Sequence, residues 1–190
     1  MNHTHHPFYR LTPLHRVMAH VVTLCLLAAA MLLASSCITE GKHVSIDESN
    51  LVNVGQKLPD FTVSLASGLD VTTTSLTGRP SVIVLFNTEC SDCRRELPVV
   101  QQLYEEYADR VSFLCISREQ GQEEVKQYWS ENHLTLPVAP QDDRRVFSLF
   151  ALRSIPRVYV SDASLTVRTV FAERVNEKRL RATIDELLHL

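Results

Sequence analysis

The sequence predicts an α/β domain over residues 55–190, with a central mixed β-sheet covered by helices on both faces. Two apolar, β-branched runs, 81–87 and 111–117, are continuous, as is typical of strands buried on both faces. A segment with helical spacing of apolar residues follows each run, and a strand pair and a last helix close the chain. This order indicates a sheet enclosed between layers of helices.

Each element of this domain has its own local pattern. The runs "DFTVSL" and "DVTTTSL", separated by "ASG", predict an N-terminal β-hairpin. Apolar residues at helical spacing predict a helix over 91–109. The later predicted elements are helices over 123–133 and 143–152, strands over 157–162 and 165–171, and a closing helix over 176–190 with Asn176 as its N-cap.

A leader precedes the domain. Arg10 and Arg16 are followed by an uncharged stretch, 17–36, whose apolar centre and small last residues indicate a secretory signal. A stretch of about 20 residues could instead span a bilayer as a permanent helix. His20 and Thr23 weaken that alternative because they interrupt the apolar run.

The end of the leader, "LLASSC", resembles the lipobox of bacterial lipoproteins. The resemblance implies that Cys37 is acylated and becomes the new N-terminus. We therefore expect a signal peptide over 1–36, a polar tether over 37–54 and the folded domain over 55–190. An ordinary signal peptide followed by an unmodified cysteine is the alternative.

The charge of the mature chain excludes one class of partner. Removal of 36 residues leaves 154 of the 190, and it removes two arginines and no acid, so the formal charge of −3 becomes −5. An acidic domain without a stripe of lysine and arginine binds nucleic acid poorly. We therefore expect no nucleic-acid partner.

The five cysteines differ in their predicted roles. Cys25 leaves with the signal peptide, Cys37 carries lipid, and Cys115 lies in a run typical of a buried strand. Cys90 and Cys93 remain, in the motif "CSDC". An exported pair is in a compartment where disulfides form and persist.

The predicted position of this pair favours redox chemistry. Cys90 stands where strand 81–87 meets the helix, and the N-terminus of a helix favours a thiolate over a thiol. Cys93, three residues on, returns to the same face of the helix. We expect Cys90 to be the exposed nucleophile and Cys93 the shielded resolving thiol.

Two other readings of the pair are possible. A zinc site needs about four ligands, and the mature chain adds only the scattered His43, His133 and His189. A static disulfide between Cys90 and Cys93, which are only three positions apart, would close a small loop and give little entropic stabilisation. We therefore expect neither a metal nor another cofactor.

From residue 55 onward the chain resembles the thioredoxin-like superfamily, specifically the TlpA/ResA-like thiol–disulfide oxidoreductases of the bacterial cell envelope. The motifs that carry the resemblance are "VGQKLPDFTVSL", "VIVLFN" before "CSDC", Pro98 after it, and "SIPRVYV". It implies a thioredoxin-like fold with a cis bond at Ile155–Pro156, placed against the cysteines. In this family the residue before the cis-proline pairs through its backbone with an extended substrate.

The resemblance also assigns roles to further residues. Glu96 matches a glutamate that tunes proton transfer at the resolving cysteine, here Cys93. Ile155, Pro156 and Arg157 correspond to the substrate-binding segment, although Arg157 replaces the usual threonine. If Arg157 faces Cys90, its charge offsets nearby acids and attracts acidic substrates.

These features predict a membrane-anchored oxidoreductase that exchanges dithiols and disulfides with exported proteins, as a reductant fed by a thiol-reducing membrane electron donor. We expect a lipid anchor and a periplasmic domain. Ile38, in place of an aspartate after the lipid-bearing cysteine, favours the outer membrane.

Two alternatives belong to other functional classes. A peroxiredoxin shares the fold and the "LPDF" opening, but its motif has a threonine three residues before the reactive cysteine, where this chain has Asn87. A thioredoxin-fold copper chaperone or binding module spaces its cysteines by three residues and adds a histidine, and neither feature is present here.

Overall fold

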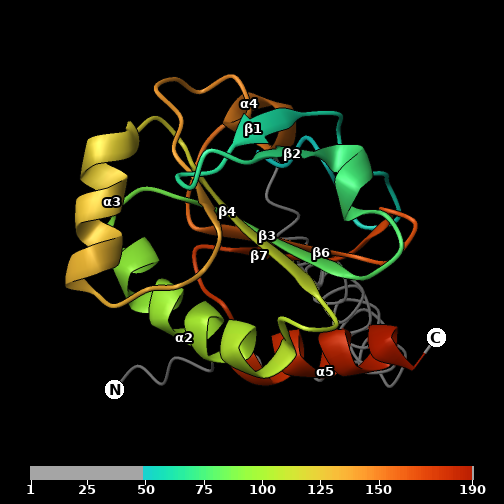
Figure 1. Cartoon of the computed structure of the whole chain (residues 1–190). Helices are drawn as coiled ribbons and strands as arrows, with labels where there is room; N and C mark the ends of the chain where they lie inside the picture. The colour runs from blue at the N-terminus through green and yellow to red at the C-terminus, as the bar shows by residue number, and fades with distance from the viewer. Residues whose placement is uncertain (1–48, 190) are drawn as a thin grey trace, which may run out of the picture. The chain divides into compact units, whose positions relative to one another are not determined.

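The computed structural model describes residues 49–189. Its central sheet has five strands in the order β5-β4-β3-β6-β7 (Figure 1). These strands are β3 (Ser81–Phe86), β4 (Ser112–Ser117), β5 (Val138–Ala139), β6 (Arg157–Ser161) and β7 (Val167–Ala172). β3, β4 and β5 are parallel, whereas β6 is antiparallel to β3 and β7 to β6. The sheet is therefore mixed, as predicted.

Helices cover both faces of this sheet. The elements outside it are α2 (Ser91–Tyr107), α3 (Gln122–Glu131), α4 (Phe147–Phe150), α5 (Glu177–Leu188) and the hairpin of β1 (Thr62–Ser64) and β2 (Asp70–Thr72). On one face the rings of Phe86 and Trp129 pack at 4.9 Å, and on the other those of Phe150 and Tyr159 pack at 5.1 Å. α2 and α5 lie on one side, and α4 and the hairpin on the other (Figure 1). The predicted fold class and hairpin are confirmed.

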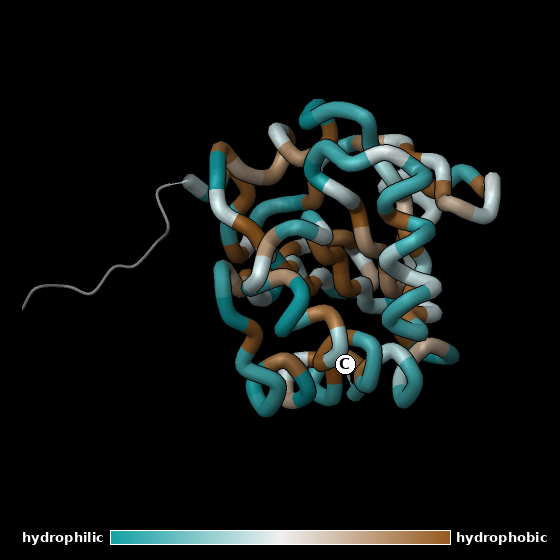
Figure 2. The backbone as a smooth tube through the Cα atoms, turned by 90° about the vertical axis from the view of Figure 1, so that its left-hand side faces the viewer, coloured by the Kyte–Doolittle hydropathy of each residue, from teal (hydrophilic) through white to brown (hydrophobic). Residues whose placement is uncertain are grey.

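β3 is the centre of the core. Every residue from Ser81 to Phe86 is buried, and hydrophobic segments fill the interior while hydrophilic ones lie outside (Figure 2). Burying each large apolar side chain contributes about 1.5–3 kcal/mol. The Ser81 and Ser161 hydroxyls, which are also buried, hydrogen-bond each other at 2.6 Å.

Some elements differ from their predicted form. The run 70–76 is a strand only to Thr72, and Thr73–Leu76 forms a 3-10 turn. The hydroxyl of Thr73 accepts from Phe61 N at 2.8 Å, so this buried side chain bonds to backbone inside the fold. Only Phe147–Phe150 of the helix expected over 143–152 is helical. β5 was not predicted, because two residues give no periodicity.

The predicted boundary between tether and domain at residue 55 is wrong. The amides of Leu51 and Val52 donate to the carbonyl of Phe150, and Asn50 forms a bridge with Ala151. Val52 is only 6% exposed. The end of the expected tether therefore belongs to the folded domain, because its backbone and one apolar side chain find partners there.

The predicted signal peptide, the lipid-bearing Cys37 and residues 38–48 of the tether lie outside the described residues. Within 49–189, no helix has both the length and the apolar character needed to cross a membrane.

Candidate active site

A tight turn places Cys90 at the start of α2. After β3 ends, the side chain of Asn87 accepts from the amide of Glu89 at 2.8 Å, and its carbonyl accepts from the amide of Cys90 at 3.2 Å. Cys90 is the N-cap of the helix. The junction of a buried strand and a helix N-terminus is where the sequence predicted it.

The two cysteines occupy unlike environments. Cys90 is half-buried, whereas Cys93 is 0% exposed. The amide of Cys93 donates to Sγ of Cys90 at 3.4 Å, which is the N-cap interaction of α2. Sγ of Cys90 therefore takes up one of the free N–H groups in the first turn of α2.

Burial raises the pKa of Cys93 well above its usual value. Its hydrogen bond with Cys90 raises the pKa further, and the negative charge of Asp92 adds to the effect, while a backbone hydrogen bond from Asn87 opposes it. Cys93 therefore remains a neutral thiol near pH 7. Cys115 is a core residue of β4, as its strand pattern predicted, and burial raises the pKa of this thiol as well.

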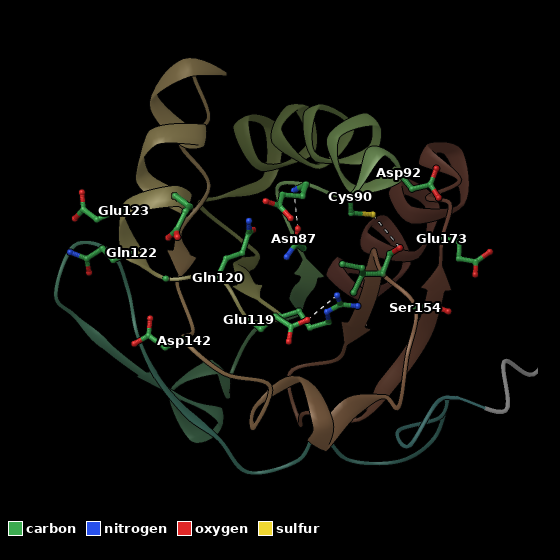
Figure 3. Close-up of a pocket in the computed structure, with 15 residues that line it drawn as sticks. Asn87, Cys90, Asp92, Glu119, Gln120, Gln122, Glu123, Asp142, Ser154 and Glu173 are labelled. Atoms are coloured by element: carbon green, nitrogen blue, oxygen red, sulfur yellow. Dashed lines mark hydrogen bonds and ion pairs between the residues drawn. The ribbon is translucent and has the colours of Figure 1, made fainter.

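The second wall of the site is the segment before β6. The Ile155–Pro156 bond is cis, and the thiol of Cys90 donates to the carbonyl of Ile155 at 3.6 Å (Figure 3). Ser154 and Glu173 flank this bond with φ of 64° each, a region that non-glycine residues rarely adopt. The amide of Glu173 donates to the carbonyl of Pro156 at 2.9 Å. The structure thus brings the cis-proline segment to Cys90, as the resemblance implied.

Cys90 opens into a cavity of about 1120 Å³, which we call the Cys90 groove (Figure 3). Its lining comes from the β3–α2 connection and the first turn of α2, from residues 118–124, and from Asp142, Ser154, Ile155 and Glu173. Figure 3 shows Cys90, Asp92, Glu173 and Ser154 on one side and Glu123, Gln122 and Asp142 on the other. The groove is larger than most small-molecule pockets, which measure about 300–1,000 Å³.

Glu96 lies in the second turn of α2 and is 7% exposed. One carboxylate oxygen accepts from Nε of Arg95 at 2.9 Å, and the other accepts from the amide of Val175 at 3.2 Å. The hydrogen bond from Val175 therefore fastens α2 to the connection between β7 and α5. Neither of these two hydrogen bonds reaches Cys93, which lies one turn earlier.

The expectation that the Arg157 side chain faces Cys90 and attracts acidic substrates is wrong. Its side chain is fully buried, at 0% exposure. Nε donates to the carbonyls of Arg153 and Ser154, at 3.1 and 3.0 Å, and the two terminal nitrogens reach the side chains of Asn50 and Ser49. Arg157 therefore holds the N-terminal segment against β6, so its side chain neither faces Cys90 nor is accessible to a partner.

Sequence reasoning missed Gln120, which supports the loop before Cys90. Its amide oxygen accepts from the backbone N–H of Thr88 at 2.6 Å, and its amide nitrogen donates to the hydroxyl of Thr88 at 2.8 Å. The two residues are 32 positions apart, so no local pattern could have indicated the pair. Ser154 and Glu173 were also missed, because no local pattern indicates a positive φ at these two residues.

The fold and this paired-thiol site define the thioredoxin-like class of thiol–disulfide oxidoreductases. The AhpC/TSA family model matches residues 54–170, and the chain belongs to that family.

Individual relatives agree with this assignment. The chain is 24% identical over 147 residues to thioredoxin-like protein YneN of Bacillus subtilis strain 168, covering 76% of this chain and 82% of that protein. It is 24% identical over 146 residues to the thiol–disulfide oxidoreductase ResA of Oceanobacillus iheyensis, covering 74% and 76% respectively. The structure of a secreted thiol–disulfide isomerase from Corynebacterium glutamicum superimposes with a TM-score of 0.66 at 19% identity, covering 78% of this chain and 96% of the other.

Proposed function

We propose that this protein exchanges dithiol and disulfide with exported proteins through Cys90 and Cys93, acting as a reductant. The observation that carries the proposal is the asymmetry of the pair. Cys90 is accessible at the N-cap of α2 and touches the carbonyl of Ile155, whereas Cys93 is buried behind it. An accessible sulfur can attack, and a shielded thiol can resolve.

The reaction has two exchange steps. The Cys90 thiolate attacks one sulfur of a substrate disulfide, the substrate S–S bond breaks, and the other substrate sulfur leaves as a thiolate. Cys93 then loses its proton and attacks Sγ of Cys90, which forms the Cys90–Cys93 disulfide and releases the second substrate thiolate. Two electrons have passed from the pair to the substrate, and a donor dithiol must supply two more to reduce the Cys90–Cys93 disulfide again, becoming a disulfide itself.

The position of Ile155 and Pro156 beside the reactive sulfur supports their assignment to substrate binding. The carbonyl of Ile155 lies 3.6 Å from Sγ of Cys90, so a chain bonded to that sulfur would run beside this backbone. We assign the extended substrate to this edge. Glu96 serves as a positioning residue, because it ties the helix carrying both cysteines to the connection that contains Val175.

The leader supports a location in the cell envelope for this activity. A signal peptide over 1–36 and a lipid on Cys37 would anchor the domain in the cell envelope, facing the periplasm from the outer membrane. A thiol-reducing membrane donor would then regenerate the dithiol. The direction of electron flow follows from the resemblance to ResA-like reductants.

The peroxidase alternative gains no support from the site. Thr88 has both its hydroxyl and its amide bonded to Gln120, and it is buried beneath the turn. Asn87 uses its side chain to hold the amide of Glu89. The contacts of these two side chains do not indicate a role in activating a peroxide at Cys90.

A trapping experiment tests the proposal. The Cys93→Ser variant is mixed with an uncharged peptide that contains a disulfide, and the products are measured by intact mass. We expect a stable adduct on Cys90, absent from Cys90→Ser, and rapid two-electron turnover in the unmodified chain. Rapid consumption of hydrogen peroxide by Cys93→Ser, without an adduct from the disulfide, would support the peroxidase alternative.

A further inference from the structure

The Cys90 groove concentrates the negative charge of the domain. Residues 49–189 contain nineteen acids and sixteen lysines or arginines, and the groove lining contains seven of those acids and one arginine. The rest of the described domain is left with twelve acids and fifteen basic residues, so outside the groove it carries a net positive charge. The acids on the Cys90 side are Glu89, Asp92 and Glu173, and those across the groove are Glu119, Glu123, Glu124 and Asp142.

Within the described part of the chain, most of these carboxylates have no basic partner. Among the described residues, Asp92 pairs with Arg95 at 2.7 Å and Glu119 with Arg118 at 2.9 Å and Arg144 at 3.8 Å. No ion pair joins the other five acids of the groove to a basic side chain within 49–189. Their charges therefore remain uncompensated at the wall of a cavity.

Two of the arginines at the groove are already bonded to acids. Arg118, the one arginine of the lining, is bonded to Glu119 and stacks on the ring of Phe147. Arg95 forms ion pairs with both Asp92 and Glu96. Six of the seven groove carboxylates are exposed, and like charges gathered around one cleft raise the local concentration of ions of opposite sign.

We propose that the substrate of Cys90 is a polypeptide with a lysine- or arginine-rich segment beside its disulfide. This inference rests on the proposed function and specifies its substrate class. The groove begins at the nucleophile and at the Ile155 carbonyl, and it extends to the N-terminal end of α3, where Glu123 and Glu124 lie. A chain joined to Cys90 by a mixed disulfide passes along these acids, so basic flanking residues speed the encounter.

The chemistry is the exchange already described. The charged segment adds no bond and no electron, since it only places the substrate disulfide at Sγ of Cys90. Association between opposite charges weakens as salt screens it, within about 10 Å at 0.1 M ionic strength. The preference for a basic substrate must therefore decrease as salt is added.

Two synthetic peptides test this proposal on the full chain in a nonionic detergent. They share one intramolecular disulfide and differ in the flanking residues, all lysine in one and all glutamate in the other. The rate of oxidation of the reduced protein is measured for each and divided by the rate of the same peptide with 2-mercaptoethanol, an uncharged thiol. We expect the lysine peptide to be preferred by about tenfold or more at low salt, with most of the preference lost at high salt.

A set of variants locates the effect. Glu123→Gln, Glu124→Gln and Asp142→Asn together remove three groove charges, whereas Asp109→Asn, Glu131→Gln and Glu186→Gln together remove three exposed charges from helix ends outside it. The preference for the lysine peptide should fall at least threefold in the groove variant and should not change in the control variant. Circular dichroism checks that both variants are folded.

The outcomes separate the two proposals. Equal rates for both peptides, or a preference unchanged by salt in the unmodified chain, would overturn the inference while the oxidoreductase function stands. If neither these peptides nor an uncharged one oxidised Cys90 and Cys93, the proposed function itself would fail. Equal losses in the groove and control variants would show that overall charge, and not the groove, selects the peptide.

Discussion

At the scale of single residues, the site depends on one difference between two identical side chains. Cys90 caps α2 and meets the groove, and Cys93 is enclosed three residues later. The sequence predicted both roles, because a buried strand followed by a helix fixes where each cysteine lies. It could not predict that the Arg157 side chain is buried and bonded to Ser49 and Asn50, because these partners are 108 and 107 positions away.

The raised pKa of Cys93 leads to a prediction for the second exchange step. Burial, the largest cause, persists when Cys90 is in a mixed disulfide, whatever becomes of the hydrogen bond that the Cys93 thiol donates to Cys90. The attacking thiolate therefore stays scarce below the pKa of Cys93. The rate of resolution should rise about tenfold per pH unit from pH 6 to 8.

Acid quenching and intact mass would follow the loss of the mixed disulfide at each pH. Cys93→Ser is the control, and it should show no resolution at any pH. A rate independent of pH over this range would mean that Cys93 is already ionised, contrary to the effect of its burial.

The same thiols link stability to pH. Cys93 and Cys115 have raised pKa values in the folded state, so above about pH 8.5 the unfolded chain loses protons that the folded chain keeps. Their contribution is complete below pH 8.5 and decreases above it. The free energy of unfolding of the reduced protein should fall between pH 8.5 and 9.5, by up to about 1.4 kcal/mol per thiol.

Urea unfolding of the reduced chain at several pH values measures this slope. In Cys115→Ala the slope between pH 8.5 and 9.5 should be smaller, since one titrating group is gone, whatever the cost of the substitution at neutral pH. Identical slopes in the variant and the unmodified chain would show that Cys115 does not contribute.

At the scale of elements, the N-terminal segment and β6 form one unit. Arg157 joins the carbonyls of Arg153 and Ser154 to the side chains of Ser49 and Asn50, directly beside the cis-proline. The sequence pattern predicted β3, β4 and β6 because short apolar runs rich in β-branched residues favour buried strands. It could not find the docking of 49–52, because polar residues paired with a distant strand resemble a tether.

Replacing Arg157 should therefore weaken the whole unit. Arg157→Met leaves buried acceptors unpaired, and we expect a loss of roughly 3–5 kcal/mol in the free energy of unfolding. Arg157→Lys, which cannot reproduce the planar fork of donors, should lose less. The matched control Arg168→Met, on the exposed side of β7, should change stability by no more than about 0.5 kcal/mol. Equal effects of Arg157→Met and Arg168→Met in urea unfolding would contradict this account.

At the scale of the whole molecule, the proposed lipid decides where the chemistry occurs. If Cys37 carries the anchor, Cys37→Ala should move the protein from the membrane fraction to the soluble fraction after cleavage of the leader. Fractionation with immunodetection measures this shift, and the unmodified chain serves as the reference. Continued membrane association of Cys37→Ala would indicate that residues 17–36 remain as a permanent helix.

The central claim is that Cys90 and Cys93 form a reversible, redox-active disulfide, and the reduction potential tests it most directly. The full chain is equilibrated in defined thiol–disulfide buffers, and the fraction oxidised is read by alkylation and mass. We predict a two-electron transition that requires both cysteines, near the thioredoxin value of about −270 mV. A value near the roughly −120 mV of DsbA would make the protein an oxidant, and the absence of any reversible Cys90–Cys93 disulfide would contradict the account.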